Sequence, residues 1–173
     1  YDIPINFNLP YIANNMANFW HRWHISLSTW LRDYLFIPLG GSRGSRWLTN
    51  RNLLLTMTLG GLWHGASWNF VVWGVFHGLA LVIHREFTFL KEKITPLKNF
   101  VESKLGNLLS MLLTFHAVCV GWVFFRVQEI STGFNIVKKM VLFSPIYAGA
   151  EAQSHQFLIL QNHLPVVVVI SIV

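Results

Sequence analysis

The sequence is short of charge. Only 12% of its 173 residues are Asp, Glu, Lys or Arg, against about 25% in ordinary soluble domains, and 53% are hydrophobic. Three stretches of more than about twenty residues, the length of a membrane-spanning helix, have no charged side chain at all, residues 52–84, 105–125 and 152–173. A helix needs about 20 apolar residues to cross roughly 30 Å of hydrocarbon. The composition argues against a soluble domain and predicts an all-α fold, a polytopic (multi-pass) helical bundle integral to a membrane.

Cysteine is almost absent, since Cys119 is the only one. The chain can therefore form no internal disulfide, and it has no CxxC metal motif. Neither an activating partner near Cys119 nor a nucleophile elbow around a serine is visible, which disfavours a covalent acyl-enzyme. The sequence also lacks an N-terminal signal peptide and stops inside an apolar run. We expect residues 1–173 to be a single membrane domain, the C-terminal fragment of a longer protein.

The formal net charge of +6 raises the question of nucleic acid binding. However, the basic residues lie between the apolar stretches and do not gather on one face with stacking aromatics. This distribution is typical of juxtamembrane segments facing anionic lipid, so we expect membrane lipid and no nucleic acid as a partner. If residues 52–84 enter the membrane and return, residues 1–51 and 85–104, with five Lys and Arg each, share the cytoplasmic side.

The stretch 52–84 is too long for one straight span. As a continuous helix it would measure about 50 Å at 1.5 Å per residue. Gly60-Gly61 supplies a natural break, and Ser67 is a plausible N-cap for a second helix. We therefore expect a broken or re-entrant helix. The predicted short helix, irregular stretch and spanning helix are residues 51–59, 60–66 and 67–84.

His64 lies in the predicted break, in the string GLWHGASWN. An ionisable side chain at membrane depth costs several kcal/mol unless it is paired or hydrated. Irregular backbone at that depth occurs only where protein or a water-filled cavity covers it, so we expect His64 to line a cavity. A neutral imidazole there could act as a general base, kept neutral by the positive end of the second helix. The alternative is a core histidine bonded to a carbonyl at the helix break.

Other histidines give weaker signals. A helix over residues 19–37 would place His21 and His24 three residues apart and close together. Without a third ligand, this spacing does not predict a metal site, and an interfacial aromatic belt with solvated histidines is the simpler interpretation. His77 is expected to be a packing histidine, bonded to a neighbouring helix. Residues 40–46 form a Gly-rich basic turn, in which arginines could meet a phosphate-bearing donor or simply anionic lipid.

The rest of the chain alternates between connectors and spans. A charged connector is expected over residues 85–104 and a span over 105–125. A second connector over residues 126–151 includes an amphipathic piece at 133–143. A last span is expected to start near residue 157.

Three strings carry a resemblance to a known family. They are NFWHRWHISLSTWLRDYLFIPLGG at residues 18–41, NLLLTMTLGGLWHGASWNFVVWGVFHG at 52–78, and GWVFFRVQEISTGFNIVKKM at 121–140. As an ordered set they resemble the membrane-bound O-acyltransferase (MBOAT) family, nearest to its bacterial alginate O-acetylation branch. The family's members are about twice this length or more, so donor contacts in the missing part cannot be carried over.

The resemblance implies a multi-pass enzyme of the cell (inner, cytoplasmic) membrane that transfers an acyl group, expected to be acetyl, to a hydroxyl. The family's near-invariant histidine matches His64, which implies a general base. Its second motif histidine matches His24, which implies a partner that positions the substrate or lines the tunnel. No bound cofactor and no metal are implied. The donor would be acetyl-CoA or another acyl thioester, and the acceptor an exported or cell-surface polysaccharide, reached directly or through periplasmic or extracellular acyl-relay proteins.

Two rival functions stay open on the sequence. A transporter or channel can also use a discontinuous helix with polar residues at the membrane midplane, in which case His64 would line a solute site. A scaffold subunit would use His64 only for packing. A transporter of this type is expected to show an inverted repeat, and none is visible in these 173 residues.

Overall fold

Every regular element within residues 4–142, the part of the chain that the computed structural model describes, is a helix. The chain divides by its contacts into two units, Tyr1–Phe134 and Asn135–Val173, and His24, His64 and His77 all lie in the first. The helical elements are η1 (Pro10–Ile12), α1 (Met16–Arg22), α2 (Ile25–Leu31), η2 (Arg32–Phe36), α3 (Arg46–Trp63), α4 (Trp68–Lys93), α5 (Thr95–Glu102), α6 (Lys104–Arg126) and α7 (Ile130–Val141). The predicted all-α fold is confirmed. The last span expected near residue 157 lies outside the described residues.

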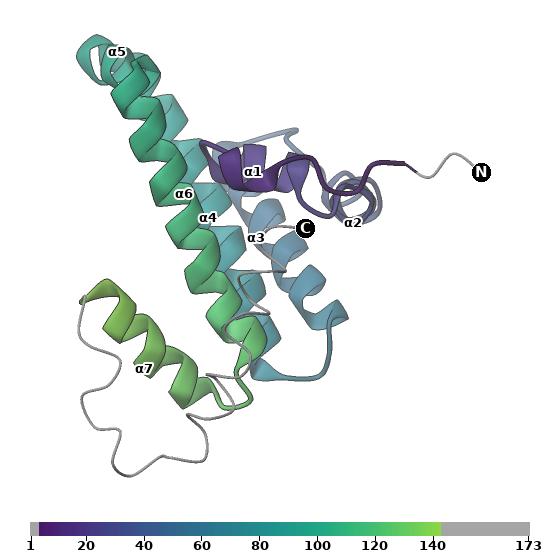
Figure 1. Cartoon of the computed structure of the whole chain (residues 1–173). Coiled ribbons are helices and arrows are strands. Elements are labelled where there is room, and N and C mark those ends of the chain that lie inside the picture. Colours follow the sequence, from purple (N-terminus) through teal and green to yellow (C-terminus); the bar gives the residue numbers. More distant parts are fainter. Residues whose placement is uncertain (1–3, 143–173) are drawn as a thin grey trace. The chain divides into compact units, whose positions relative to one another are not determined.

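Two of these helices, α4 and α6, are long and apolar enough to cross a membrane. They lie side by side in Figure 1 and contact each other along their lengths. Only 22% and 28% of their most apolar windows are buried, whereas the core helix of a soluble protein would be mostly buried. Ile83 and Leu113, for example, are 66% and 71% exposed. The span predicted over residues 105–125 corresponds to α6.

Helices α3 and α4 form an antiparallel hairpin packed through glycines. A Cβ on Gly61 would lie 2.2 Å from the carbonyl oxygen of Phe70, and one on Gly74 would lie 2.4 Å from that of Met57. The backbones of the two helices therefore approach as closely as small residues permit. This corrects the prediction that Gly60-Gly61 breaks the helix, because both glycines are helical and α3 continues to Trp63. The absence of a side chain at Gly61 instead allows α3 and α4 to pack closely.

The break in the hairpin comes later than predicted and is shorter. Residues 64–67 separate α3 from α4, in place of the predicted 60–66. Ser67 caps α4 as expected, since its hydroxyl accepts a hydrogen bond from the backbone N–H of Asn69 at 3.3 Å. Gly65, with φ +155°, provides a turn conformation that other residues rarely adopt. The hairpin thus places His64 at its turn.

The predicted helix over residues 19–37 is two helices and a π-helical turn. Helix α1 ends at Arg22, and α2 begins at Ile25, with His24 between them at φ +46° and ψ +55°. Backbone groups freed at this break bond to the N-terminal segment: Asn8 N–H to Arg22 O and Ile25 N–H to Asn6 O, both at 2.9 Å. His21 and His24 are therefore not neighbours on one helical face.

The charged connector predicted over residues 85–104 is helical for most of its length. Helix α4 runs on to Lys93, and the short α5 begins at Thr95, with Pro96 in its first turn. Proline fits that position because its missing N–H would have no helical partner there. The predicted amphipathic piece corresponds to α7, which begins three residues earlier at Ile130.

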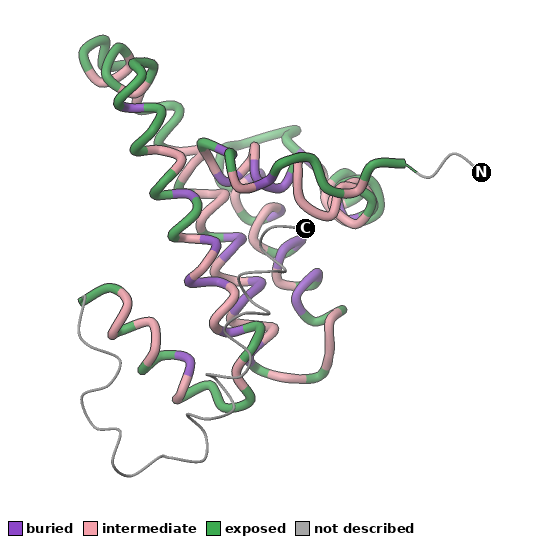
Figure 2. The backbone as a smooth tube through the Cα atoms, viewed as in Figure 1, coloured by how far each residue is buried: buried purple, intermediate pink, exposed green. Residues whose placement is uncertain are grey.

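The core lies where α1 crosses α4 and α6. Figure 2 marks buried positions on each of these three helices. Phe19, Val118 and Phe124 are at most 3% exposed. The only side chain of the described residues that is both titratable and fully buried here is His77, at 0% exposure. An aromatic and aliphatic core therefore fixes the position of the hairpin turn relative to α1 and α6.

Candidate active site

His64 is the C-cap residue of α3 and opens the turn into α4. Its imidazole is half-buried and is walled by aromatic rings from three helices. The ring centroids of Trp63, Phe70, Trp73 and Phe125 lie 5.1, 6.0, 5.3 and 5.0 Å from that of His64. Trp73 and Phe125 stand edge to face against it, at 88° and 80°. The site is thus a polar ring in an apolar wall that is open on one side.

The electrostatics of His64 favour its neutral form. Within the described residues its ring nitrogens make no protein hydrogen bond, so the expected alternative of a core histidine bonded to a carbonyl is not seen here. Burial lowers the pKa of His64 below its usual 6.5, and His24 would lower it further only when its own ring is protonated. A neutral imidazole with a free nitrogen can accept a proton. The ring contacts of the two predicted residues are with different partners, Phe7 for His24, and Trp63, Phe70, Trp73 and Phe125 for His64.

His24 is held by the N-terminal segment. The side-chain oxygen of Asn6 accepts hydrogen bonds from the backbone N–H and the hydroxyl of Ser26, both at 3.0 Å. This orients the amide nitrogen of Asn6 toward Nδ1 of His24, at 3.4 Å. Because an amide nitrogen can only donate, Nδ1 is the acceptor and Nε2 carries the hydrogen of the neutral ring. His24 is therefore arranged as a hydrogen-bond donor through Nε2, whereas His64 is free to accept.

A buried amide, which sequence reasoning missed, locks α4 to the end of α6. Asn69 is 4% exposed, and its Nδ2 donates to the carbonyls of Val127 at 2.7 Å and Gln128 at 2.9 Å. These bonds hold the C-terminal end of α6, with Phe125, against the hairpin turn. The signal in the sequence was an Asn in the first turn of an otherwise apolar helix, but its partners lie almost sixty residues away.

His77 packs as predicted, but without the predicted bond to a neighbouring helix. It lies between α1, α4 and α6, with ring contacts to Trp20 at 5.2 Å and Trp73 at 4.8 Å. Neither of its ring nitrogens has a hydrogen-bond partner within the described residues. Trp73 lies between His77 and His64 and contacts both rings.

A cavity of about 240 Å³ lies under α1 and α2, against α3 and α4. Trp20, Thr56 and Met57 are among its lining residues, with Arg32 and His21. It is mainly apolar with a few polar groups, as ligand pockets commonly are. That His64 itself lines a cavity stays a prediction.

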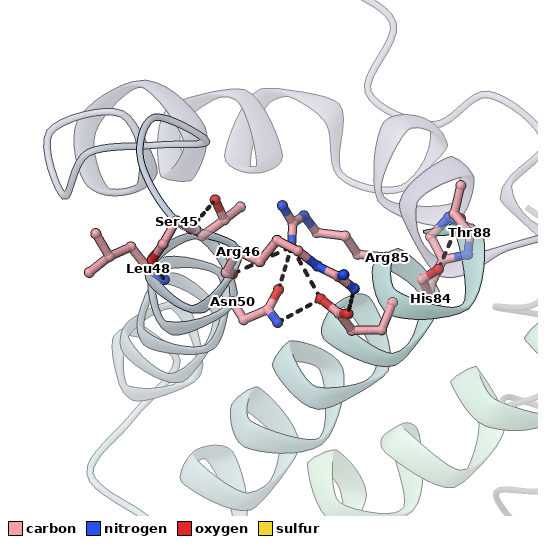
Figure 3. A network of polar contacts seen from close by, with 9 residues as sticks. Ser45, Arg46, Leu48, Asn50, His84, Arg85 and Thr88 are labelled. Carbon is pink, nitrogen blue, oxygen red and sulfur yellow. Dashed lines mark hydrogen bonds and ion pairs between the residues drawn. The ribbon is translucent and has the colours of Figure 1, made fainter. Parts of the chain in front are cut away.

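The opposite end of the hairpin carries the charges. Figure 3 shows Arg46 and Asn50 of α3 facing Arg85 of α4. Asn50 bonds Glu86 and Arg85, both at 2.8 Å, and Arg46 and Arg85 pair with Glu86. Both guanidinium groups also lie over the ring of Phe89, at 4.4 and 4.9 Å. Hence the hairpin has one polar, cationic end and one uncharged end that holds His64.

The Gly-rich basic turn is tied to the same end. Nδ2 of the buried Asn52 donates to the carbonyl of Gly41 at 3.0 Å, and Nη2 of Arg51 donates to Oδ1 of Asn52 at 2.8 Å. Gly40, Gly41 and Gly44 have φ of +110°, +55° and +97°, which explains the glycines. Within the described residues no group of three His, Cys, Asp or Glu side chains could hold a metal ion.

Comparison with known proteins gives a family match over most of the chain. The model of the membrane-bound O-acyltransferase (MBOAT) family matches residues 2–125. A peptidoglycan O-acetyltransferase of Helicobacter pylori is 44% identical over 139 residues, covering 80% of this chain and 25% of that protein. A probable alginate O-acetylase AlgI of Pseudomonas aeruginosa is 47% identical over 138 residues, covering 80% of this chain and 25% of that protein. A teichoic acid D-alanyltransferase of Streptococcus thermophilus is 35% identical over 135 residues, covering 70% of this chain and 32% of that protein. The chain spans about a quarter to a third of the length of these curated relatives.

Proposed function

Because the chain belongs to the membrane-bound O-acyltransferase family, we propose that the full protein is an O-acyltransferase. It transfers an acyl group, acetyl in the first place, from a thioester donor such as acetyl-CoA to a hydroxyl of a cell-surface or exported polysaccharide. It does so as a multi-pass protein of the cytoplasmic membrane. The names of the relatives support this, since two are named for O-acetylation of peptidoglycan and of alginate, and one for D-alanyl transfer to teichoic acid. The acceptor is thus a cell-wall or exported polymer, reached directly or through a relay protein outside the membrane.

His64 is the general base of the reaction. The acceptor hydroxyl gives its proton to the free imidazole nitrogen as its oxygen attacks the acyl carbon. The C–S bond of the tetrahedral intermediate then breaks, and the imidazolium returns the proton to the thiolate. No net proton is consumed. The lowered pKa of His64 supports this role, because the base stays neutral and ready near pH 7.

His24 supplies a hydrogen bond from Nε2 to the acyl carbonyl, whose oxygen gains negative charge in the intermediate. A positioned donor at that atom contributes a large share of such catalysis. Asn6 supports the role by holding Nδ1 as an acceptor, so that the hydrogen is on Nε2. Aromatic walls around His64 exclude bulk water, which would otherwise hydrolyse the thioester.

The observation that carries the proposal is the setting of His64 at the hairpin turn, where Trp73 and Phe125 stand edge to face against a ring that makes no hydrogen bond within the described residues. A packing histidine in a scaffold subunit would be expected to have its nitrogens paired, and the family match favours acyl transfer over a solute site in a transporter.

Polysaccharide O-acetyl content in cells that carry the full-length protein tests the proposal. We expect His64→Ala and His64→Gln to abolish O-acetylation per molecule of membrane protein. His116→Ala is the matched control, since His116 is an exposed histidine of α6 far from the hairpin turn along its helix, and it should leave O-acetylation unchanged. Normal O-acetylation with His64→Gln at normal protein level would return His64 to a packing role.

A further inference from the structure

His77 is an imidazole sealed inside an aromatic cage. It is 0% exposed, and the space for its Nε2 exists only because residue 121 is glycine, since a Cβ there would lie 2.6 Å from that nitrogen. The rings of Phe19, Trp20, Trp73 and Phe76 surround it at 6.4, 5.2, 4.8 and 5.5 Å. No further group can reach this ring without displacing one of its neighbours.

The cage leaves the polar atoms of three rings unpaired. Nδ1 and Nε2 of His77 and the indole nitrogens of Trp20 and Trp73 are all buried and have no hydrogen-bond partner in the described structure. Buried polar atoms are almost always paired, because an unpaired one loses its bond to water and gains nothing. Such atoms in one cluster of three touching rings lower stability, and a phenylalanine at position 77 would remove the part of this cost that the two nitrogens of His77 contribute.

The chemistry of the cluster explains what an imidazole adds. Both indole N–H groups can only donate, and a neutral imidazole has one acceptor nitrogen. His77 is thus the only one of these three rings that offers a hydrogen-bond acceptor, and its ring stands at 82° to that of Trp20 and at 58° to that of Trp73. A phenyl ring would fill the same space and keep aromatic packing, but it would offer the indole N–H groups no acceptor.

We propose that His77 is a positioning residue that sets the orientation of Trp73 and, through Trp73, of the imidazole of His64. The path is a chain of ring contacts, His77 to Trp73 at 4.8 Å and Trp73 to His64 at 5.3 Å and 88°. Trp73 and His77 are four residues apart on α4 and so lie on one face of the helix. The catalytic part of this inference rests on the proposed function, whereas the effect on His64 does not.

The test uses the full-length protein in detergent with three variants at two positions. His77→Phe removes the polar edge, and His77→Gln restores an acceptor. Gly121→Ala pushes on His77 from α6. The matched control is Gly133→Ala, whose Cβ would lie 2.9 Å from the ring of Phe124, a comparable crowding outside the cage. The probe is diethyl pyrocarbonate, with the rate of carbethoxylation of His64 measured by mass spectrometry relative to His116.

We expect His77→Phe to change the ratio of His64 to His116 labelling at least about threefold, with a melting temperature equal to or above that of the wild type. The initial rate of polysaccharide O-acetylation in cells should fall at least about tenfold, since displacement of a catalytic group by 1 Å costs up to 10²-fold. His77→Gln should retain more activity than His77→Phe. Gly121→Ala should change the labelling ratio, and Gly133→Ala should not.

Three results would overturn the proposal. An unchanged labelling ratio in both His77→Phe and Gly121→Ala means that His77 does not position His64. A much lower melting temperature of His77→Phe means that its nitrogens are paired and stabilising. Equal or greater activity of His77→Phe compared with His77→Gln means that only the shape of the ring matters. If the wild type transfers no acyl group, while the labelling ratio changes as expected, the proposed function fails and the positioning of His64 stands.

Discussion

Replacement of Gly61 by alanine tests the packing that places the hairpin turn. The new Cβ would lie 2.2 Å from the carbonyl oxygen of Phe70, about 1.2 Å inside ordinary van der Waals contact at 3.4 Å, and 3.1 Å from the Cα of Gly74. All of these are backbone atoms, so no side chain can rotate away. Helices α3 and α4 would have to separate by about 1 Å along the seam. Such overpacking costs about 3 kcal/mol, and the better helix propensity of alanine offsets about 1 kcal/mol.

The adjacent glycine is the matched control. A Cβ on Gly60 meets only the terminal methyl groups of Leu31, at 3.1 and 3.4 Å, and these can rotate. Gly60→Ala makes the same change in propensity one position away and should be neutral or slightly stabilising. We therefore expect the two variants to differ by roughly 2–3 kcal/mol.

Thermal unfolding of the full-length protein, followed by tryptophan fluorescence in detergent, measures the difference. The melting temperature of Gly61→Ala should lie several degrees below that of Gly60→Ala. Its O-acetylation rate should also fall by about 10²-fold where the protein is still folded, because the shift moves His64 relative to α4. Equal melting temperatures of the two variants would show that α3 and α4 do not meet at this glycine, and the account of the seam would be wrong.

Three further predictions concern the site and the charged end of the hairpin. Asn69→Leu leaves the carbonyls of Val127 and Gln128 without their donor and should lower the stability by about 1–3 kcal/mol, so an unchanged melting temperature would contradict the role of this amide. Glu86→Gln removes the partner of two partly exposed arginines and should lower the melting temperature slightly in low salt and not at all in 1 M salt, because exposed ion pairs are screened. Burial lowers the pKa of His64. If His64 acts as the proposed base, the acid limb of the transfer rate should therefore have its midpoint below the ordinary histidine value of 6.5, and a midpoint at or above 6.5 would refute that role.

The helices could be predicted from the sequence because their signals are local. The uncharged stretch 105–125 corresponds to α6, the stretch 52–84 covers most of α3 and the first part of α4, and Ser67 caps α4 as predicted. Glycine is different, because it has two opposite uses, to break a helix or to let another helix approach. Which use applies at Gly61 depends on Phe70 and Gly74, and only their position in space decides it.

The break at His24 had no local signal, since neither glycine nor proline lies between Trp20 and Leu31. It forms because Asn6 and Asn8, from the N-terminal segment, bind the backbone groups that the broken helix frees. In the same way, His64 was singled out by its uncharged surroundings, whereas Phe125 in its wall could not be, because α6 is brought there by packing. The motif residues can thus be predicted from the sequence, whereas the residues that surround them in the fold cannot.

The backbone conformation at His24 favours only a few residue types at this position. Its φ of +46° lies in a region that costs most residues about 1–2 kcal/mol, and that glycine, Asn, Asp and His occupy more easily. Of these four residues, only His has a ring nitrogen that can donate a hydrogen bond. The backbone of the bend between α1 and α2 therefore restricts position 24 to a few residue types, and the proposed chemistry selects His among them. A descendant that loses the proposed activity but keeps the fold is therefore expected to carry Asn or glycine here, whereas Lys, Glu or an aliphatic residue would cost about 1–2 kcal/mol, a cost that the chain accepts at Leu9, with φ +47°.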